Sequence, residues 1–177
     1  MKNYLIISLL IFSVGFCQSK KEYHINDLLF DDGIVKMKFS NEIPNGRVYF
    51  WNSKNKVYIG NIKNGKQDGF WTLWYENGRK IMEGTFKNGE QDGLHTFWYE
   101  NGKEETRVRF KNGKQNGLMT KWYENGMIKE EGIFKDGKPE GFMTKWYENG
   151  QMKLQGTFKD GKWIDSKKWN EDGSMKE

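Results

Sequence analysis

Residues 93–102 read Gly-Leu-His-Thr-Phe-Trp-Tyr-Glu-Asn-Gly, and close copies of this stretch recur along the chain at a fixed interval. Four units of 24 residues follow one another, at 69–92, 93–116, 117–140 and 141–164. Such self-similarity is typical of arrays in which each unit packs on its neighbours. The positions expected to be structural are Trp74, Trp98, Trp122, Trp146, Gly78, Gly102, Gly126, Gly150, Phe86, Phe110, Phe134 and Phe158.

The repeat is incomplete at both ends of the array. Residues 46–68 form a unit that is one residue short and keeps Trp51 without the Tyr-Glu-Asn-Gly that follows Trp elsewhere. Residues 165–177 form a broken unit, and residues 18–45 form a divergent lead-in. Terminal units of repeat arrays are usually atypical because they cap an open stack. We therefore expect caps at 18–45 and 165–177 around an array at 46–164.

Each unit predicts two strands, for example residues 70–75 and 80–87. The Asn-Gly between them is a strong hairpin signal because both residue types tolerate a positive φ. The second connection, residues 88–92, is expected to be a longer loop. The chain contains no alanine, the best helix former. The predicted fold is all-β, an elongated antiparallel β-meander of two-stranded repeats.

The length of the first loop decides which side chains share a face, because strand side chains alternate. A two-residue loop would pair Trp74 with Ile81, whereas a three-residue loop ending in a left-handed Gly78 pairs Trp74 with Lys80. We favour the three-residue loop, because it gathers the repeated aromatic residues on one side. A two-residue loop with a bulge at Gly84 is the alternative. The predicted core face then carries Phe70, Thr72, Trp74, Gly84 and Phe86, and the glycines at 84, 132 and 156 leave room for a neighbouring ring.

The opposite face is a candidate binding face. Tyrosines two strands apart would repeat every ~10 Å, a spacing that suits an extended glycan or peptide. The alternative for the tyrosines is that they only pack on the sheet. The lysines are either solvated charges or contacts for an anionic lipid or glycan. The residues assigned to this candidate face are Tyr75, Tyr99, Tyr123, Tyr147, Trp71, Lys121 and Lys145.

The sequence contains few of the residue types that carry catalytic or metal-binding chemistry. There are two histidines and one cysteine, and His24 has no cysteine or second histidine nearby. His95 takes a position held by Trp71, Met119 and Met143 in the other units, so we interpret it as a tolerated substitution. The glutamates of the repeats fall in turns. We expect no enzyme activity, no cofactor and no metal.

The first 17 residues are typical of an export signal. Lys2 precedes a run from Tyr4 to Phe12 that is apolar apart from Ser8, and the apolar character continues to Phe16. This run is too short to span a bilayer. Gly15 and Cys17 form a small-x-small site, so cleavage after Cys17 is predicted. Two alternatives stay open, a lipoprotein acylated on Cys17 and an uncleaved anchor. The mature chain would have no transmembrane segment and would be periplasmic, on the outer surface or secreted.

The charge of the mature chain gives no sign of nucleic acid binding. Without Lys2, 28 basic residues face 24 acidic ones, a net charge of +4. The two signs interleave along the chain, so no concentrated basic patch is expected.

The run from Glu83 to Gly93, continued by Trp98-Tyr99-Glu100-Asn101-Gly102, resembles the MORN repeat and more closely its bacterial variant. Asp32-Gly33 and Pro44-Asn45-Gly46 resemble the lead-in of the same proteins. The resemblance implies an elongated antiparallel β array without a catalytic motif. Many such proteins carry the name YwqK-type antitoxin, which fits an exported chain only as immunity to an exported toxin.

Three functions follow as expectations. The first is a protein-interaction module of the cell envelope with an unidentified protein partner, and immunity is a special case of it. The second is binding of a cell-wall polysaccharide, and the third, weaker one is binding to a membrane surface.

Overall fold

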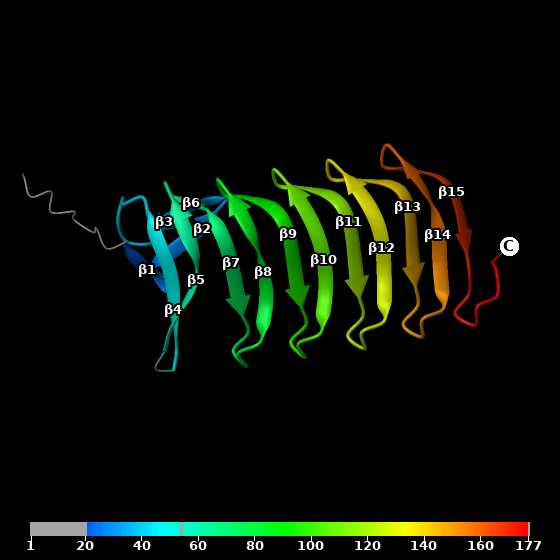
Figure 1. Cartoon of the computed structure of the whole chain (residues 1–177), viewed down its shortest axis with the longest axis horizontal. Helices are drawn as coiled ribbons and strands as arrows, with labels where there is room; N and C mark the ends of the chain where they lie inside the picture. Colours follow the sequence, from blue (N-terminus) through cyan, green and yellow to red (C-terminus); the bar gives the residue numbers. More distant parts are fainter. Residues whose placement is uncertain (1–20, 54, 177) are drawn as a thin grey trace, which may run out of the picture.

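A computed structural model describes residues 21–53 and 55–176. The predicted export signal and its cleavage site at Cys17 lie outside these residues. Figure 1 shows an elongated row of strands with the N-terminal unit at one end and the C-terminus at the other. The nine-stranded sheet that makes up most of this row confirms the predicted all-β meander.

The nine-stranded sheet runs in chain order from β7 to β15, and all its pairs are antiparallel. Its strands are β7 (Gly69–Trp74), β8 (Lys80–Lys87), β9 (Glu90–Trp98), β10 (Glu104–Lys111), β11 (Lys114–Trp122), β12 (Ile128–Lys135), β13 (Lys138–Trp146), β14 (Met152–Lys159) and β15 (Lys162–Lys168). After β15, a single bridge joins Trp169 to Met175.

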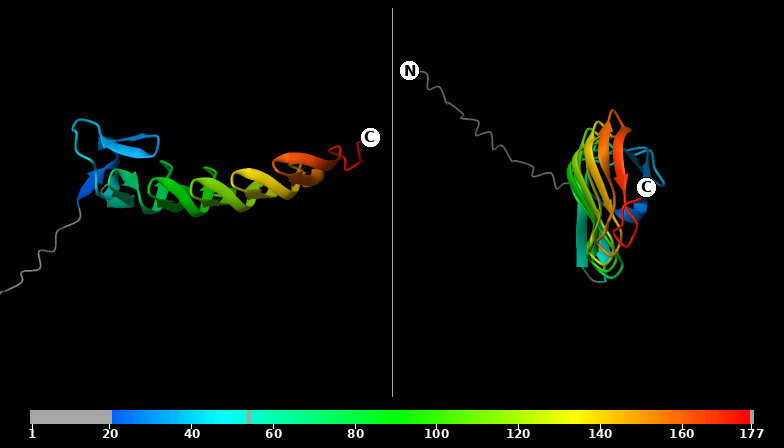
Figure 2. Two further views of the ribbon diagram at one scale, coloured as in Figure 1. Left: turned by 90° about the horizontal axis from the view of Figure 1, so that it is seen from above. Right: turned by 90° about the vertical axis from the view of Figure 1, so that its right-hand side faces the viewer.

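The N-terminal unit is built differently. A four-stranded sheet has the order β1-β4-β5-β6, in which β1 pairs with β4 in parallel. A separate hairpin, β2–β3, projects from the line of the array (Figure 2). These elements are β1 (Glu22–His24), the 3-10 helix η1 (Ile25–Asp27), β2 (Leu28–Asp31), β3 (Ile34–Met37), β4 (Gly46–Asn52), β5 (Asn55–Lys63) and β6 (Lys66–Gln67).

The second connection of each repeat is shorter than predicted. Asn88 and Gly89 both have a positive φ, of 52° and 86°, and Lys87 pairs directly with Glu90. This is a two-residue hairpin turn, so the longer loop predicted at 88–92 is wrong. The strand simply continues through residues 90–98.

The turn after Trp74 has the predicted length. Trp74 pairs with Lys80, and Gly78 has a φ of 82°. The Tyr75 N–H donates to the Arg79 carbonyl oxygen at 2.8 Å, and the Arg79 N–H donates to Oδ1 of Asn77 at 2.9 Å. The asparagine side chain therefore closes the turn from within.

The predicted grouping of side chains is nevertheless wrong, because a register shift lies between Leu73 and Trp74. Trp71 pairs with Gly84 and Gly69 with Phe86, so Gly84 and Phe86 share a face with Trp71 rather than with Phe70 and Thr72. A bulge inserts one residue and reverses the alternation beyond it. The predicted core face thus combined residues from both sides of the sheet.

We call the side that carries Trp71, His95, Met119 and Met143 the inner face and the side that carries Phe70, Leu94, Leu118 and Phe142 the outer face. All four named residues of the inner face are at most 4% exposed. A Cβ on Gly84 would lie 2.3 Å from the His95 ring, and one on Gly132 would lie 2.9 Å from Cε of Met143. The repeated glycine therefore leaves room for the side chain opposite it, which is a ring at Gly84, as predicted, and a methionine side chain at Gly132.

The repeated phenylalanines complete this core. The Phe86 ring lies 6.3 Å from the Trp71 ring and 5.3 Å from the His95 ring, edge to face in both cases. Phe110 lies 5.1 Å from His95 on the other side. Such edge-to-face pairs add to the free energy of burial. A continuous aromatic stack thus joins the first repeats.

Candidate functional site

The tyrosine ladder ties each repeat to the next. The Tyr75 hydroxyl donates to the carbonyl oxygen of Trp98 at 2.9 Å. Tyr99, Tyr123 and Tyr147 do the same to Trp122, Trp146 and Trp169. Burial raises the pKa of the Tyr99 and Tyr123 hydroxyls above the ordinary value. These hydroxyls therefore serve contacts within the array.

The asparagines of the same loops form a second ladder. Nδ2 of Asn77 donates to the carbonyl oxygen of Glu100 at 3.2 Å, one repeat further on. The equivalent bonds start from Asn101, Asn125 and Asn149. The Tyr-Glu-Asn-Gly motif therefore acts between repeats as well as within its own turn.

The remaining residues of the candidate binding face divide into buried and charged ones. Trp71 is 1% exposed and its Nε1 donates to the Asn61 carbonyl oxygen, so the placement of Trp71 on a ligand-accessible face is wrong. Lys121 and Lys145 both lie near Glu130, with N–O distances of 3.9 and 3.3 Å. The structure does not bring Trp71 and the two lysines together with the tyrosine hydroxyls as one exposed surface.

The two histidines have local roles. Nε2 of His95 lies 2.8 Å from the Thr85 carbonyl oxygen, and burial lowers the pKa of His95 below the ordinary value despite this bond. Nδ1 of His24 accepts the Asn26 N–H at the start of η1. Across residues 21–53 and 55–176, no group of three or more His, Cys, Asp or Glu side chains is placed to hold a metal ion.

The candidate site lies where the repeat contacts break down, between β5 and β7. The unit 46–68 has Asn52 where the later units have tyrosine. β6 pairs with β5 at Lys63 and Ile62, and the Asp68 N–H just after β6 still donates to the Asn61 carbonyl oxygen. Beyond that bond β7 belongs to a different sheet. The β4–β5 hairpin and the β7–β8 hairpin therefore separate toward their tips.

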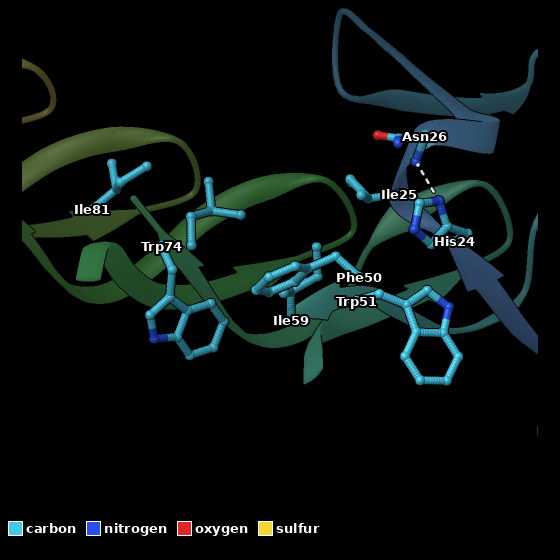
Figure 3. A pocket seen from close by; sticks show the side chains of 9 residues that line it. His24, Ile25, Asn26, Phe50, Trp51, Ile59, Trp74 and Ile81 are labelled. Atoms are coloured by element: carbon cyan, nitrogen blue, oxygen red, sulfur yellow. Dashed lines mark hydrogen bonds between the residues drawn. The ribbon is translucent and has the colours of Figure 1, made fainter. Parts of the chain in front are cut away.

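Two hollows of about 380 and 460 Å³ occupy this junction. Both are lined by Phe50, Trp51 and Trp74, and the Phe50 and Trp74 rings lie 6.0 Å apart. Figure 3 shows the first hollow, to which η1 adds Ile25 and Asn26 and the neighbouring strands add Ile59 and Ile81. An apolar concavity with a few polar groups at its rim is the usual form of a binding site.

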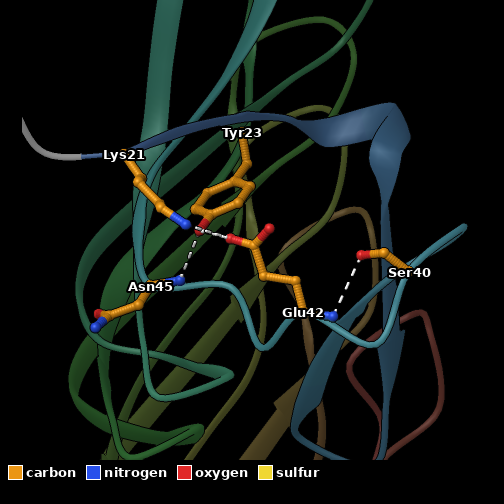
Figure 4. A network of polar contacts seen from close by, with 5 residues as sticks. All are labelled: Lys21, Tyr23, Ser40, Glu42 and Asn45. Atoms are coloured by element: carbon orange, nitrogen blue, oxygen red, sulfur yellow. Dashed lines mark hydrogen bonds and ion pairs between the residues drawn. The ribbon is translucent and has the colours of Figure 1, made fainter.

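A polar network fixes the strand that leads into this rim (Figure 4). Nζ of Lys21 lies 2.7 Å from Oε1 of Glu42, which also accepts the Tyr23 hydroxyl at 3.0 Å. The Tyr23 hydroxyl in turn accepts the Asn45 N–H. The hydrogen bond from Lys21 is the main reason why the pKa of Glu42 lies below its ordinary value. β1 is thereby fastened beside β4, with His24 to Asn26 following at the edge of the hollow.

Sequence reasoning missed this junction. Its residues, such as Phe50 and Ile59, stand in the atypical first unit, where the repeat offers no comparison. The available signal was the loss of Tyr-Glu-Asn-Gly after Trp51, because that motif holds consecutive repeats together elsewhere.

Comparison with known proteins supports the family resemblance. A search of curated proteins finds no match for the chain. Within the part of the chain that the structure describes, no helix is long and apolar enough to cross a membrane. The MORN repeat variant model matches residues 67–88, 91–113, 115–136 and 139–160, which together make up half of the chain. Such repeats are typical of protein-interaction or membrane-binding modules. With four consecutive matches on a meander of the expected geometry, the chain belongs to the MORN repeat variant family.

Proposed function

We propose that this chain is an exported, non-catalytic protein-interaction module of the cell envelope, which binds its partner at the junction of the N-terminal unit and the array. The aromatic hollows around Phe50, Trp51 and Trp74 carry this proposal. Tryptophan is among the residues that dominate the binding energy of protein interfaces. Trp51 is 54% exposed beside a concave apolar surface, an arrangement that suits an apolar side chain of a partner.

The export and the location in the envelope are supported by the apolar N-terminal run after Lys2. Immunity to an exported toxin is the special case that the resemblance to YwqK-type proteins implies. Both belong to the proposal.

The test is affinity capture from a native envelope extract with three forms of residues 18–177. These are the unchanged chain, Trp51→Ala in the hollow, and Phe70→Ala as the control. Phe70 is 60% exposed on the outer face, so its loss removes an exposed aromatic ring away from the hollow. Circular dichroism verifies that all three forms are folded.

The expected result is one stoichiometric protein retained by the unchanged chain and by Phe70→Ala and lost from Trp51→Ala. Equal retention by both variants would refute the hollow as the site. Retention of glycan without protein would instead establish that the chain binds a cell-wall polysaccharide. Binding to anionic vesicles that is lost at high salt would establish that the chain binds to a membrane surface.

A further inference from the structure

The outer face of the last repeats carries exposed apolar side chains on three neighbouring strands. Leu118 on β11 pairs with Ile133 on β12, and Phe142 on β13 follows in the same row. Their exposed fractions are 55%, 49% and 72%. A contiguous apolar patch on a sheet face is a feature that normally marks an interaction surface.

The three apolar side chains are flanked by opposite charges. Arg109 on β10 pairs with Leu94 on β9 and lies on its other side next to Gly117, the residue before Leu118. Arg109 takes part in no ion pair among the described residues. On the other side Phe142 pairs with Thr157, and Thr157 pairs with Asp165 on the last strand, β15. Oδ1 of Asp165 accepts the Thr157 N–H at 2.7 Å. A hollow of about 290 Å³ lies here, lined by Phe142, Gln155, Gly156, Thr157, Asp165, Ser166 and Lys167.

We propose that this patch binds a second copy of the chain around a two-fold axis that passes between Ile133 and Phe142 and runs along the strands. The axis places Ile133 on Phe142 of the second copy and Leu118 on its Thr157. It also places Arg109 above Asp165 of the second copy. The arginine then reaches the hollow and pairs with that carboxylate, and the same contact forms twice.

The order of the row favours a second copy over another occupant. An apolar centre with a cation on one side and a carboxylate on the other is complementary to itself under a two-fold rotation. A two-fold dimer is also the commonest homo-oligomer, and its interface uses one patch twice. Apolar side chains at the centre with charges at the rim are the usual anatomy of an interface.

The size of the patch sets the expected strength. A standard interface buries ~800 Å² on each partner, and three strands of one face provide less. Glu131 also lies on the outer face of β12, beside Thr120 and Thr144 in the register, so the two copies bring one carboxylate to each side of the axis. We expect a reversible dimer with a Kd of roughly 1–100 μM.

Sedimentation equilibrium of residues 18–177, over a concentration range from below to above this Kd, measures the association. Phe142→Asp is expected to weaken the dimer at least 100-fold, because it places a charge in the apolar centre. Glu131→Gln is expected to tighten it several-fold. Leu94→Ala, a conservative truncation of an exposed residue outside the central contact, serves as the control and should change the Kd less than threefold.

A charge exchange tests the arrangement itself. Arg109→Asp should weaken the dimer about tenfold, and the double variant Arg109→Asp with Asp165→Arg should restore most of that loss. If the change at Asp165 unfolds the chain, Ile133→Cys replaces it. Two sheets packed face to face lie ~10 Å apart. A bismaleimide of that span should therefore join two copies of the Ile133→Cys variant at high yield, and two copies of the Leu94→Cys variant poorly.

A chain that stays monomeric at all concentrations would overturn the proposal. So would a dimer that Phe142→Asp leaves intact, or one that is cross-linked equally from both cysteine positions. Because the Trp51 hollow lies at the other end of the array, loss of this dimer and loss of partner capture are separate results.

Discussion

The array and the N-terminal unit are both β structure, but they are held together in different ways. In the array one tyrosine and one asparagine make the same two bonds to the next repeat, from Tyr75 and Asn77 to Tyr147 and Asn149. In the N-terminal unit the long-range polar contacts occur once each. Glu42 binds Lys21 and Tyr23, and Glu22 binds Lys56 and Tyr58.

The difference shows how a repetitive structure can carry a binding site at one position only. Identical contacts give identical spacing, so the array offers the same surface at each step. Where Asn52 replaces the tyrosine, the spacing is no longer imposed and the hairpins of β4–β5 and β7–β8 separate at their tips. The aromatic hollows lie at this boundary.

The largest expected loss of stability comes from changing the repeated glycine, and it should differ between the two regions. A Cβ on Gly60 would lie 2.1 Å from the Trp71 ring, which is buried and hydrogen-bonded to Asn61. We expect Gly60→Ala to lower the free energy of unfolding by about 3 kcal/mol. Gly132→Ala in the array meets the flexible end of Met143 and should cost about 1 kcal/mol or less. Urea denaturation measures both, and equal losses would show that the junction is as adaptable as the array.

The next effect tests the ladder. Tyr123→Phe removes the hydroxyl that bonds the Trp146 carbonyl oxygen at 2.8 Å. We expect a loss of about 1 kcal/mol, since a partly buried acceptor is left without its donor. Tyr58→Phe in the N-terminal unit removes the bond to Glu22 from an exposed side chain, and a smaller loss is expected. If Tyr58→Phe proves the costlier change, the periodic bonds are not what holds the array together.

We expect His95 to give one repeat a stability that depends on pH. Burial holds the pKa of His95 below its ordinary value of 6.5, so the unfolded chain binds a proton more readily than the folded chain. Stability should therefore fall as pH is lowered through about 6.5, and the fall should end below the folded pKa. His95→Met, which copies Met119 and Met143, should abolish this loss in thermal unfolding between pH 8 and pH 5. A variant that keeps the full pH dependence would assign it to other groups.

The smallest expected effect concerns the charges of the array. Lys145 lies 3.3 Å from Glu130 but remains 40% exposed, and exposed ion pairs contribute little. Lys145→Ala should change the free energy of unfolding by about 0.5 kcal/mol or less, measured by urea denaturation at low and high salt. A larger, salt-sensitive loss would mean that Lys121, Glu130 and Lys145 act as a network.

Several features could be predicted because they depend on local chemistry. The period fixed the meander, and Asn-Gly fixed the turns, as the loop from Trp74 to Lys80 shows. The glycine at position 84 signalled a close approach, which His95 makes. The faces could not be predicted, because a single bulge between Leu73 and Trp74 reverses the alternation, and no residue at that position marks it.

The sequence by itself determined the repeat, its strands and its family, since each is encoded within 24 consecutive residues. Only the tertiary structure decided which aromatic residues are buried, where the tyrosine hydroxyls bind and where the surface is hollow. These depend on registers between strands and on contacts between residues far apart in the chain, such as Phe50 with Trp74 and Phe142 with Thr157. The two sites proposed here, at the junction and on the outer face, arise from such contacts.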